Sequence, residues 1–298
     1  MEVFDQHKQR YGSPRVTRVL QQEGFRCGEN RVARLMREQE LAARRKRAFR
    51  PRTTVAGERV APNRIKDLEP SGPDHIWVSD ITYVATREGW LYLAVILDRF
   101  SRKVVGWKLG DTLEAELVVT ALQNALSRRE PPRGFYFHSD QGCQYSSEAV
   151  RKPLTLLGAN LSMSGRGNCD ENATAEAFFS TLKTEAFPSD QVFATKADAR
   201  RELFEYIEVY YNNLRLHSGL GYQTPRRYET EFKRVVDSES SPRQASGAAA
   251  EDRALRGRTS SAEAALQTAG GAASRRPAGP AGASPKRKIP GGSEDRVL

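Results

Sequence analysis

Residues 76–98 read IWVSDITYVATREGWLYLAVILD, and this stretch decides the fold. Its first part, IWVSDITYVA, is rich in β-branched and aromatic residues and ends near the turn signal REG, which is typical of a strand. Its second part, GWLYLAVILD, is almost wholly apolar, as expected for a strand buried on both faces at the centre of a sheet. The stretch therefore predicts two neighbouring strands, the second of them central.

The rest of the middle region predicts further strands that alternate with helices. These elements are a strand at 103–110 (KVVGWKLG), a helix at 113–128, a strand at 135–140 (FYFHSD), a helical stretch from Ser146, a short strand at 161–164, and helices at 172–186 and 196–213. Three strands joined by turns, followed by strands that alternate with helices, indicate an α/β protein with a mixed sheet.

Residues 7–41 predict two short helices on either side of a glycine turn. Ser13, followed by a proline, indicates the N-cap of the first helix, Gly24 ends it, and Asn30 could cap the second. This pattern fits a small DNA-binding helix-turn-helix module. An ordinary helical hairpin has the same spacing and remains an alternative.

The positive charge of the chain lies at its N-terminal end. Residues 1–66 contain 17 Lys and Arg against 7 Asp and Glu, whereas residues 67–298 contain 30 of each, so the net charge of +10 belongs to the first part. A basic segment beside a neutral one indicates a polyanionic partner. Residues 42–73 are interpreted as a basic linker whose run RRKR either follows phosphates or is simply solvated. The candidate DNA contacts in this part are Arg31, Arg34, Arg44, Arg45, Lys46 and Arg47.

Composition excludes several classes of protein. No run of 18 apolar residues and no apolar signal sequence is present, so we expect a soluble, unexported protein without a membrane partner. The three cysteines (Cys27, Cys143 and Cys169) are too far apart to indicate a disulfide framework or a zinc site. Residues 237–298 contain no aromatic residue and are rich in Ala, Gly, Ser, Pro and Arg, which predicts a disordered, low-complexity tail.

Three acidic residues occupy unusual places in the middle region. Asp80 lies within a predicted strand, where acidic residues are disfavoured, and Asp140 ends another. Glu176 lies 35 residues beyond Asp140, in the predicted helix NATAEAFFSTLKTE, where it shares one helical stripe with Ser180 and Lys183. Each acid alone has an ordinary explanation: Asp80 could bond a turn, Asp140 could cap a helix, and Glu176 could be plain surface.

Taken together, the motifs point to a known family. In order, they are WVSDITYV, LDRFSRKVVGW, HSDQGCQYSS, NATAEAFFSTLKTE and YYNNLRLHSGLGYQTP. The set resembles the integrase core of bacterial insertion-sequence transposases, specifically the second-reading-frame product of the family closest to retroviral integrases. The resemblance spans residues 7–232. It implies a ribonuclease H-like integrase core at 74–232, with a mixed five-stranded sheet and flanking helices, including a C-terminal helical extension, after a helix-turn-helix module at 7–41.

The resemblance also implies an activity and a site. The family's Asp-Asp-Glu (DDE) triad matches Asp80, Asp140 and Glu176, and Lys183 matches the basic position seven residues after the glutamate, a DNA contact. Three clustered carboxylates repel one another unless a cation is present, and oxygen-only ligands select Mg²⁺ or Mn²⁺, here two ions. Such a site would cleave DNA strands at the ends of an insertion sequence and transfer them to a target.

The expected setting follows from the same resemblance. The partners would be double-stranded DNA of the element ends and the target, further copies of this chain in a homo-oligomer on DNA, and the product of the upstream frame. The expected location is the bacterial cytoplasm, at the nucleoid. Beside Asp140, His138 is expected to orient its loop, and His217 to act as a helix cap.

Two other functions stay open at this point. One is a ribonuclease H-like nuclease, against which the basic N-terminal helices and the 35-residue spacing argue. The other is a catalytically idle DNA-binding regulator of transposition. The intact carboxylates favour an enzyme, but they are compatible with a regulator as well.

Overall fold

The computed structural model describes residues 2–44, 60–165 and 172–240. The chain forms two compact units, Met1–Ser241 and Pro242–Leu298, and the second lies outside the described residues. The candidate DNA contacts Arg45, Lys46 and Arg47 also lie outside them, as does most of the predicted tail. Among the described residues, no helix is both long enough and apolar enough to cross a membrane.

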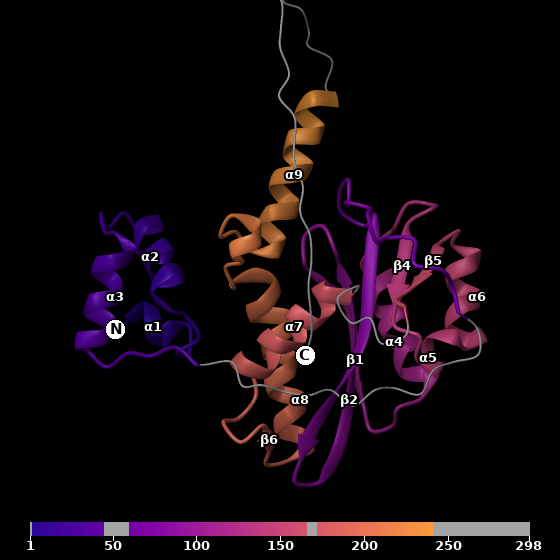
Figure 1. Cartoon of the computed structure of the whole chain (residues 1–298), viewed down its shortest axis with the longest axis horizontal. Coiled ribbons are helices and arrows are strands. Elements are labelled where there is room, and N and C mark those ends of the chain that lie inside the picture. Colours follow the sequence, from indigo (N-terminus) through magenta and orange to yellow (C-terminus); the bar gives the residue numbers. More distant parts are fainter. Residues whose placement is uncertain (1, 45–59, 166–171, 241–298) are drawn as a thin grey trace, which may run out of the picture. The chain divides into compact units, whose positions relative to one another are not determined.

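A mixed sheet forms the centre of the first unit (Figure 1). Its strands are β1 (Ile76–Thr86), β2 (Gly89–Asp98), β3 (Val104–Gly110), β4 (Tyr136–Ser139), β5 (Asn160–Met163) and β6 (Val192–Phe193). The order is β3-β2-β1-β4-β5, antiparallel from β3 to β1 and parallel from β1 to β5. The five predicted strands are present, but the sheet has six strands, because β6 pairs in parallel with the end of β1.

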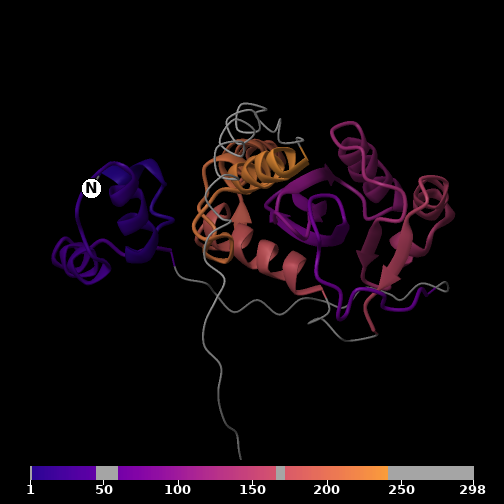
Figure 2. The ribbon, with the colours of Figure 1, turned by 90° about the horizontal axis from the view of Figure 1, so that it is seen from above.

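Helices cover both faces of the sheet (Figures 1 and 2). One face carries α4 (Ala115–Leu126), the short α5 (Cys143–Ser146) and α6 (Glu148–Leu156). The other face carries α7 (Ala173–Glu185) and α8 (Lys196–Phe204), which continues as a π-helical segment, Glu205–Tyr211. A 3₁₀ turn (Ser218–Leu220) and α9 (Pro225–Ser240) follow. The α/β class and the mixed sheet are thus confirmed.

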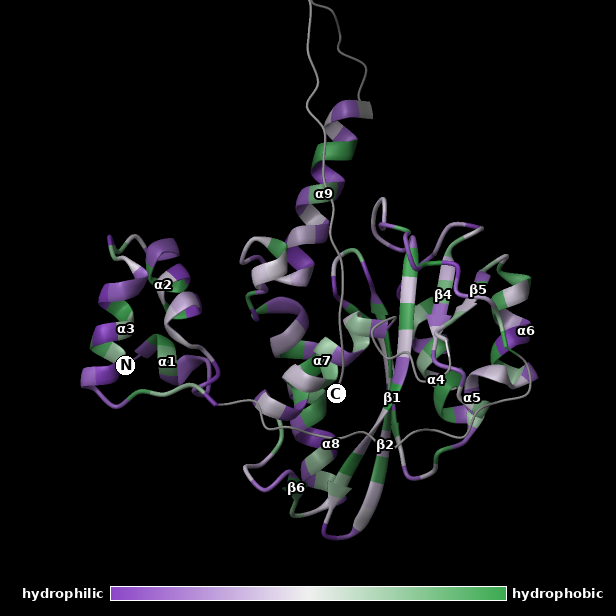
Figure 3. Cartoon of the chain, in the orientation of Figure 1, coloured by the Kyte–Doolittle hydropathy of each residue, from purple (hydrophilic) through white to green (hydrophobic). Residues whose placement is uncertain are grey.

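Two apolar clusters hold this arrangement together. Alternate residues of β1 point to opposite faces: Ile76 and Val78 pack in the cluster that contains Phe178 and other residues of α7, and Trp77 packs in the cluster that contains α4. Figure 3 shows hydrophobic residues concentrated on the strands and on the helix sides that cover them. At Gly106 of β3, an added Cβ would collide with the backbone of α4, so only glycine permits this close approach.

The N-terminal segment contains three helices, of which the sequence predicted two. They are α1 (Glu2–Gln6), α2 (Ser13–Gln22) and α3 (Glu29–Glu38). The predicted caps are wrong, because the N-cap positions are Gly12 and Gly28, with no side-chain cap bond. Both glycines hold extended backbone, and these N-cap positions lie one residue before Ser13 and two residues before Asn30, the polar residues that sequence patterns favour as caps.

Two predicted boundaries also change. In the predicted linker 42–73, Ala61 and Ile65 are buried, and the Arg64 amide donates to Ser162 Oγ at 2.9 Å. Residues 60–73 therefore pack along the core. Helix α9 extends to Ser240, so the prediction of disorder from residue 237 is wrong for 237–240. The remainder of that predicted tail, 241–298, lies outside the described residues.

Candidate active site

Strand register brings two of the predicted carboxylates together. Strands β1 and β4 are parallel, and Val78 pairs with His138. Asp80 and Asp140 each lie two residues further along, so the continuing register places them side by side where β4 ends. The carboxyl ends of parallel strands are a common place for the functional residues of α/β proteins.

The loop after β4 holds Asp140 in a defined orientation. Its Oδ1 accepts a hydrogen bond from the Gly142 amide at 3.0 Å, and its carbonyl oxygen accepts one from Ser139 Oγ at 2.9 Å. His138 is fully buried, and its two ring nitrogens lie 2.9 Å and 3.0 Å from the hydroxyls of Ser162 and Ser164. The histidine thus anchors the end of β4 to β5, consistent with the predicted orienting role.

Glu176 approaches from the other side of the sheet on α7. The helix buries Ala175, Phe179 and Leu182 in the core, whereas Glu176 is exposed. Before the first turn of α7, the Asn172 side-chain amide donates to the carbonyl oxygen of Ser79 at 3.3 Å. This bond fixes the start of the helix beside the strand residue that precedes Asp80.

The electrostatics place all three carboxylates in one field. Burial raises the pKa of Asp80 to about 7, and the negative charges of Asp140 and, to a smaller extent, Glu176 add to the rise. The Ile81 amide, which donates to Asp80 Oδ1 at 2.7 Å, acts in the opposite direction. Beneath them, burial raises the pKa of Tyr145 well above its usual value, and the charges of Asp80 and Asp140 raise it further.

Lys183 lies beside the same carboxylates. Two turns along α7 from Glu176, it is only 9% exposed. Burial lowers its pKa to about 8, and the Asp80 carboxylate opposes that change. The predicted stripe of Glu176 and Lys183 on one side of α7 therefore reaches the carboxylate pair.

The donor set fits a divalent cation in charge and in ligand type. Three carboxylates supply only oxygen ligands, and their mutual repulsion is the kind that a hard cation relieves. Within residues 2–44, 60–165 and 172–240, no three His, Cys, Asp or Glu side chains are grouped closely enough to hold a metal ion together. The sheet fixes the positions of Asp80 and Asp140, whereas the position of Glu176 depends on where α7 lies.

The predicted DNA contacts that the structure describes fall in two places. Arg31 and Arg34 are exposed on α3, opposite the buried Val32 and Met36. Arg34 forms a 3.9 Å surface ion pair with Glu38, which such exposure makes weak. Arg44 is also exposed, but its Nη1 donates to the carbonyl oxygen of Glu185 at the end of α7, at 3.2 Å.

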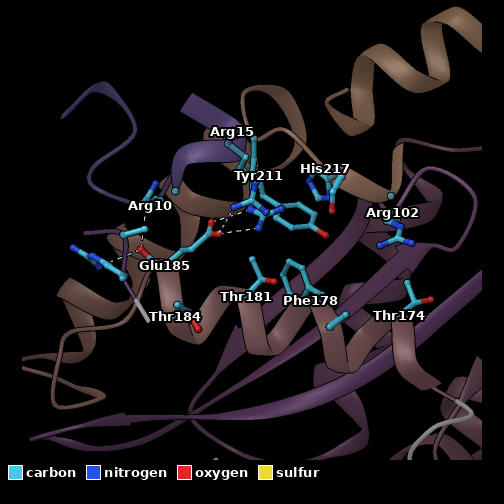
Figure 4. A pocket seen from close by; sticks show the side chains of 17 residues that line it. Arg10, Arg15, Arg102, Thr174, Phe178, Thr181, Thr184, Glu185, Tyr211 and His217 are labelled. Atoms are coloured by element: carbon cyan, nitrogen blue, oxygen red, sulfur yellow. Dashed lines mark hydrogen bonds and ion pairs between the residues drawn. The ribbon is translucent and has the colours of Figure 1, made fainter. Parts of the chain in front are cut away.

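Sequence reasoning missed a basic pocket along α7 (Figure 4). It has a volume of 410 Å³, and its arginines are Arg10, Arg15, Arg44, Arg102 and Arg215. His217 lines it too, and its ring forms a hydrogen bond with the backbone of Tyr211, the last residue of the π-helical segment, which agrees with the predicted capping role. Burial, together with nearby arginines, lowers the pKa of His217 to about 3, so its ring is neutral at pH 7. No local sequence pattern marked this pocket, because its residues lie up to about 200 positions apart.

Known protein families match the two parts of the chain separately. An HTH-like domain matches residues 1–49, and integrase core domains match residues 70–169 and 157–225. The crystal structure of the BIV integrase catalytic core domain is similar with a TM-score of 0.40 and 18% identity, over 54% of this chain and 97% of that one.

Curated relatives match most of the chain. The transposase for insertion sequence element IS904 of Lactococcus lactis is 41% identical over 229 residues, 76% of this chain and 90% of the relative. Transposase InsF for insertion sequence IS3A of Escherichia coli is 40% identical over 233 residues, 78% of this chain and 81% of the relative. The chain therefore belongs to the insertion-sequence transposases, DNA-integrating proteins in which an HTH-like domain precedes an integrase core.

Proposed function

We propose that this chain cleaves and joins DNA strands at the ends of an insertion sequence as a DDE transposase, with Asp80, Asp140 and Glu176 as its catalytic carboxylates. The observation that carries the proposal is the position of Asp80. It lies two residues beyond Val78, and Asp140 lies two residues beyond His138, the parallel partner of Val78. The pKa of Asp80 also responds to the charges of both other acids. These carboxylates, one on a strand, one just after a strand and one on a helix, correspond in order to the family's triad.

We propose further that these carboxylates hold Mg²⁺ or Mn²⁺, as two ions. When bound, divalent ions activate the attacking oxygen and stabilise the leaving oxygen of a phosphodiester. The chain's own residues supply the frame: β1 fixes Asp80, the Gly142 amide fixes one carboxylate oxygen of Asp140, and Asn172 fixes the start of α7.

The substrate under this proposal is double-stranded DNA of the element ends and of the target. Lys183, as a protonated amine with no lone pair, would contact a phosphate rather than a metal ion. Arg31 and Arg34 on α3 would face the DNA grooves, whereas Arg44 and the basic run 45–47 would contact phosphates. A homo-oligomer on DNA, with the upstream-frame product as a further partner, completes the proposed assembly.

The test is strand transfer by single variants. Asp80→Asn, Asp140→Asn and Glu176→Gln should each abolish Mg²⁺-dependent cleavage and joining while DNA binding persists. Because burial, and after it repulsion from the other carboxylates, raises the pKa of Asp80, removing one charge should leave the midpoint of thermal unfolding unchanged or higher. Glu116→Gln is the matched control, since Glu116 lies in the first turn of α4 as Glu176 does in α7.

The comparison among variants decides the assignment. A triad variant that retained near-normal strand transfer in Mg²⁺ would remove that residue from the proposed site. Loss of activity in Glu116→Gln as well would show that the assay responds to any loss of helix charge. Double variants should be no worse than single ones, because ligands of one metal cluster act as a unit.

A further inference from the structure

Helix α7 presents a third face besides the core and the carboxylate site. Thr174, Thr181 and Thr184 line the basic pocket from this face. At 3.6 residues per turn, this stripe lies roughly 80–160° around the helix axis from Glu176. Thr174 and Thr181 are seven residues apart, which is about 10 Å along the axis, or the length of about three nucleotides of a duplex strand.

Within the described part of the chain, the arginines of the pocket outnumber the carboxylates that pair with them. Arg215 donates twice to the Glu185 carboxylate, at 2.8 Å each, and Arg10 pairs with Glu202 at 3.1 Å. Arg15 lies 3.5 Å from the same Glu185. Five guanidinium groups thus face two carboxylates, which leaves three positive charges beside α7.

Among the described residues, neither Arg44 nor Arg102 of this pocket has an ion pair, and Arg44 is already bonded to the Glu185 carbonyl oxygen, which leaves Arg102. It follows β2 in the turn to β3, with a positive φ of 60°, a conformation that is uncommon for a residue other than glycine. In the part of the chain that the structure describes, its side chain has no hydrogen bond and no ion pair. Its guanidinium lies against Gly219, where an added Cβ would come within 2.8 Å of Nη2.

We propose that this pocket binds the phosphate backbone of the DNA substrate, with the Arg102 guanidinium and the hydroxyls of Thr174 and Thr181 as donors to phosphates that follow one another along the strand. The inference rests on the proposed function, because it takes DNA as the substrate. A planar guanidinium suits a phosphodiester, and the exposed position of Arg102 suits a contact with a continuous strand. Such a contact positions the strand without reading its sequence.

The consequence concerns how DNA reaches the carboxylates. The pocket and the site share α7, so a strand held at Arg102 is held at a fixed distance from Glu176. Arg15 and Arg44, which come from the N-terminal segment and line the same pocket, extend the basic wall beyond α7. The phosphate site therefore connects the DNA-reading part of the chain to its catalytic helix.

The experiment measures binding of the full chain to duplex DNA without divalent ions, so it does not depend on catalysis. The logarithm of the dissociation constant is plotted against the logarithm of the salt concentration, where each phosphate contact contributes a slope of about 0.9. Arg102→Gln should lower the slope by about that amount. Gly219→Ala should do the same, because the new methyl group displaces the Arg102 guanidinium and the backbone at Gly219 does not have a positive φ.

Two variants serve as controls. Arg102→Lys keeps the charge and should keep the slope. Arg133→Gln removes an exposed arginine on the loop before β4, away from the pocket, and should also leave the slope unchanged. An unchanged slope in Arg102→Gln, or an equal decrease in Arg133→Gln, would overturn the proposal.

A second experiment tests whether the pocket binds small anions rather than DNA. Inorganic phosphate at millimolar concentration should not raise the unfolding midpoint of the chain. If it did so in the native chain but not in Arg102→Gln, with the DNA slope unchanged, the pocket would be a small-anion site and the proposal would be wrong. Retention of strand transfer by the triad variants, in contrast, would refute the proposed function and leave this binding result as it stands.

Discussion

The Asn172 side-chain amide donates a hydrogen bond to the carbonyl oxygen of Ser79, with 3.3 Å between nitrogen and oxygen. Asn172 is the N-cap residue of α7, and Ser79 immediately precedes Asp80 in β1. One hydrogen bond therefore joins the helix that carries Glu176 to the strand that carries Asp80. Because the position of Glu176 depends on α7, removing this bond should move that carboxylate without removing any of the three acids.

Asn172→Ala should strongly lower the rate of strand transfer while lowering the free energy of unfolding only slightly. Loss of one buried hydrogen bond costs about 0.5–1.5 kcal/mol of unfolding free energy. If Glu176 is a catalytic ligand as proposed, a shift of α7 by about 1 Å can lower the rate by ~100-fold. Asn124→Ala is the control, because Asn124 on α4 makes a comparable bond to the Trp107 carbonyl oxygen at 3.1 Å, away from the carboxylates. Equal losses of activity in the two variants would contradict a positioning role for Asn172.

Glu185 should be a large contributor to stability through Arg215. Both side chains are about 95% buried, and the carboxylate also accepts from the Tyr206 hydroxyl at 2.8 Å. Glu185→Gln leaves the Arg215 guanidinium buried without an anion, which should cost about 3–5 kcal/mol in chemical denaturation. The double variant Glu185→Gln/Arg215→Met should be less destabilised than the sum of its single changes. Strict additivity would mean that the pair does not act as a unit.

Arginines of α3 and of the segment after it should differ in what they recognise. Arg31→Ala and Arg34→Ala remove exposed side chains from the proposed reading helix, so each should lower the preference for element-end DNA over shuffled DNA by about 1–3 kcal/mol. Arg44→Ala should weaken binding to both DNAs equally, because a phosphate contact carries no sequence information. Competition binding at one fixed salt concentration measures the ratio. Equal losses on both DNAs for all three variants would make α3 a plain basic surface.

The sheet could be predicted because each strand carries its own signal. The apolar run of β2 and the alternation in β1 are local patterns, and both strands lie where the sequence placed them. The neighbourhood of Asp80 and Asp140 was implied by the family resemblance, not by local patterns, and the parallel register of β1 and β4 accounts for it. The short β6 has only two residues, too few for any periodic pattern.

The features that the sequence did not reveal depend on contacts between distant segments. Arg102 meets Gly219, and the Arg10 side chain donates to the carbonyl oxygen of Glu185. Neither pair has a spacing that marks it as a neighbour. The prediction of the N-caps was wrong for another reason. The helices begin after Gly12 and Gly28, whose extended backbone needs no polar capping side chain. The packing of residues 60–73 was not predicted because the segment has three prolines and no periodic apolar pattern, which resembles a linker.

The docking of α9 on the core should depend on pH through Glu229. This residue is 9% exposed, and its carboxylate accepts from Arg129 at 2.5 Å and 3.1 Å, from Lys103 at 2.9 Å and from the Ser101 hydroxyl at 2.7 Å. Burial alone would raise the pKa of Glu229, but the hydrogen bonds and charges of Arg129 and Lys103 outweigh it and hold the pKa below its usual value. A carboxyl group with a lowered folded-state pKa stabilises the fold above its unfolded-state pKa, and that contribution is lost as the pH falls through the folded-state pKa.

The difference in unfolding free energy between the chain and its Glu229→Gln variant isolates this contribution. Asp98 faces the same Arg129, and its pKa is raised to about 6, mainly by burial, so its titration changes the stability of both proteins and makes the raw curves hard to interpret. Because the charge of Glu229 helps to raise the pKa of Asp98, the difference should increase slightly as Asp98 is protonated from pH 7 to about 5, and should shrink below the ordinary glutamate pKa of about 4.3. Glu231→Gln, at an exposed position of the same helix paired with Arg234 at 3.4 Å, should show little difference at any pH. A Glu229→Gln difference that stayed constant down to pH 3 would mean that packing around the side chain, rather than its charge, holds α9 on the core.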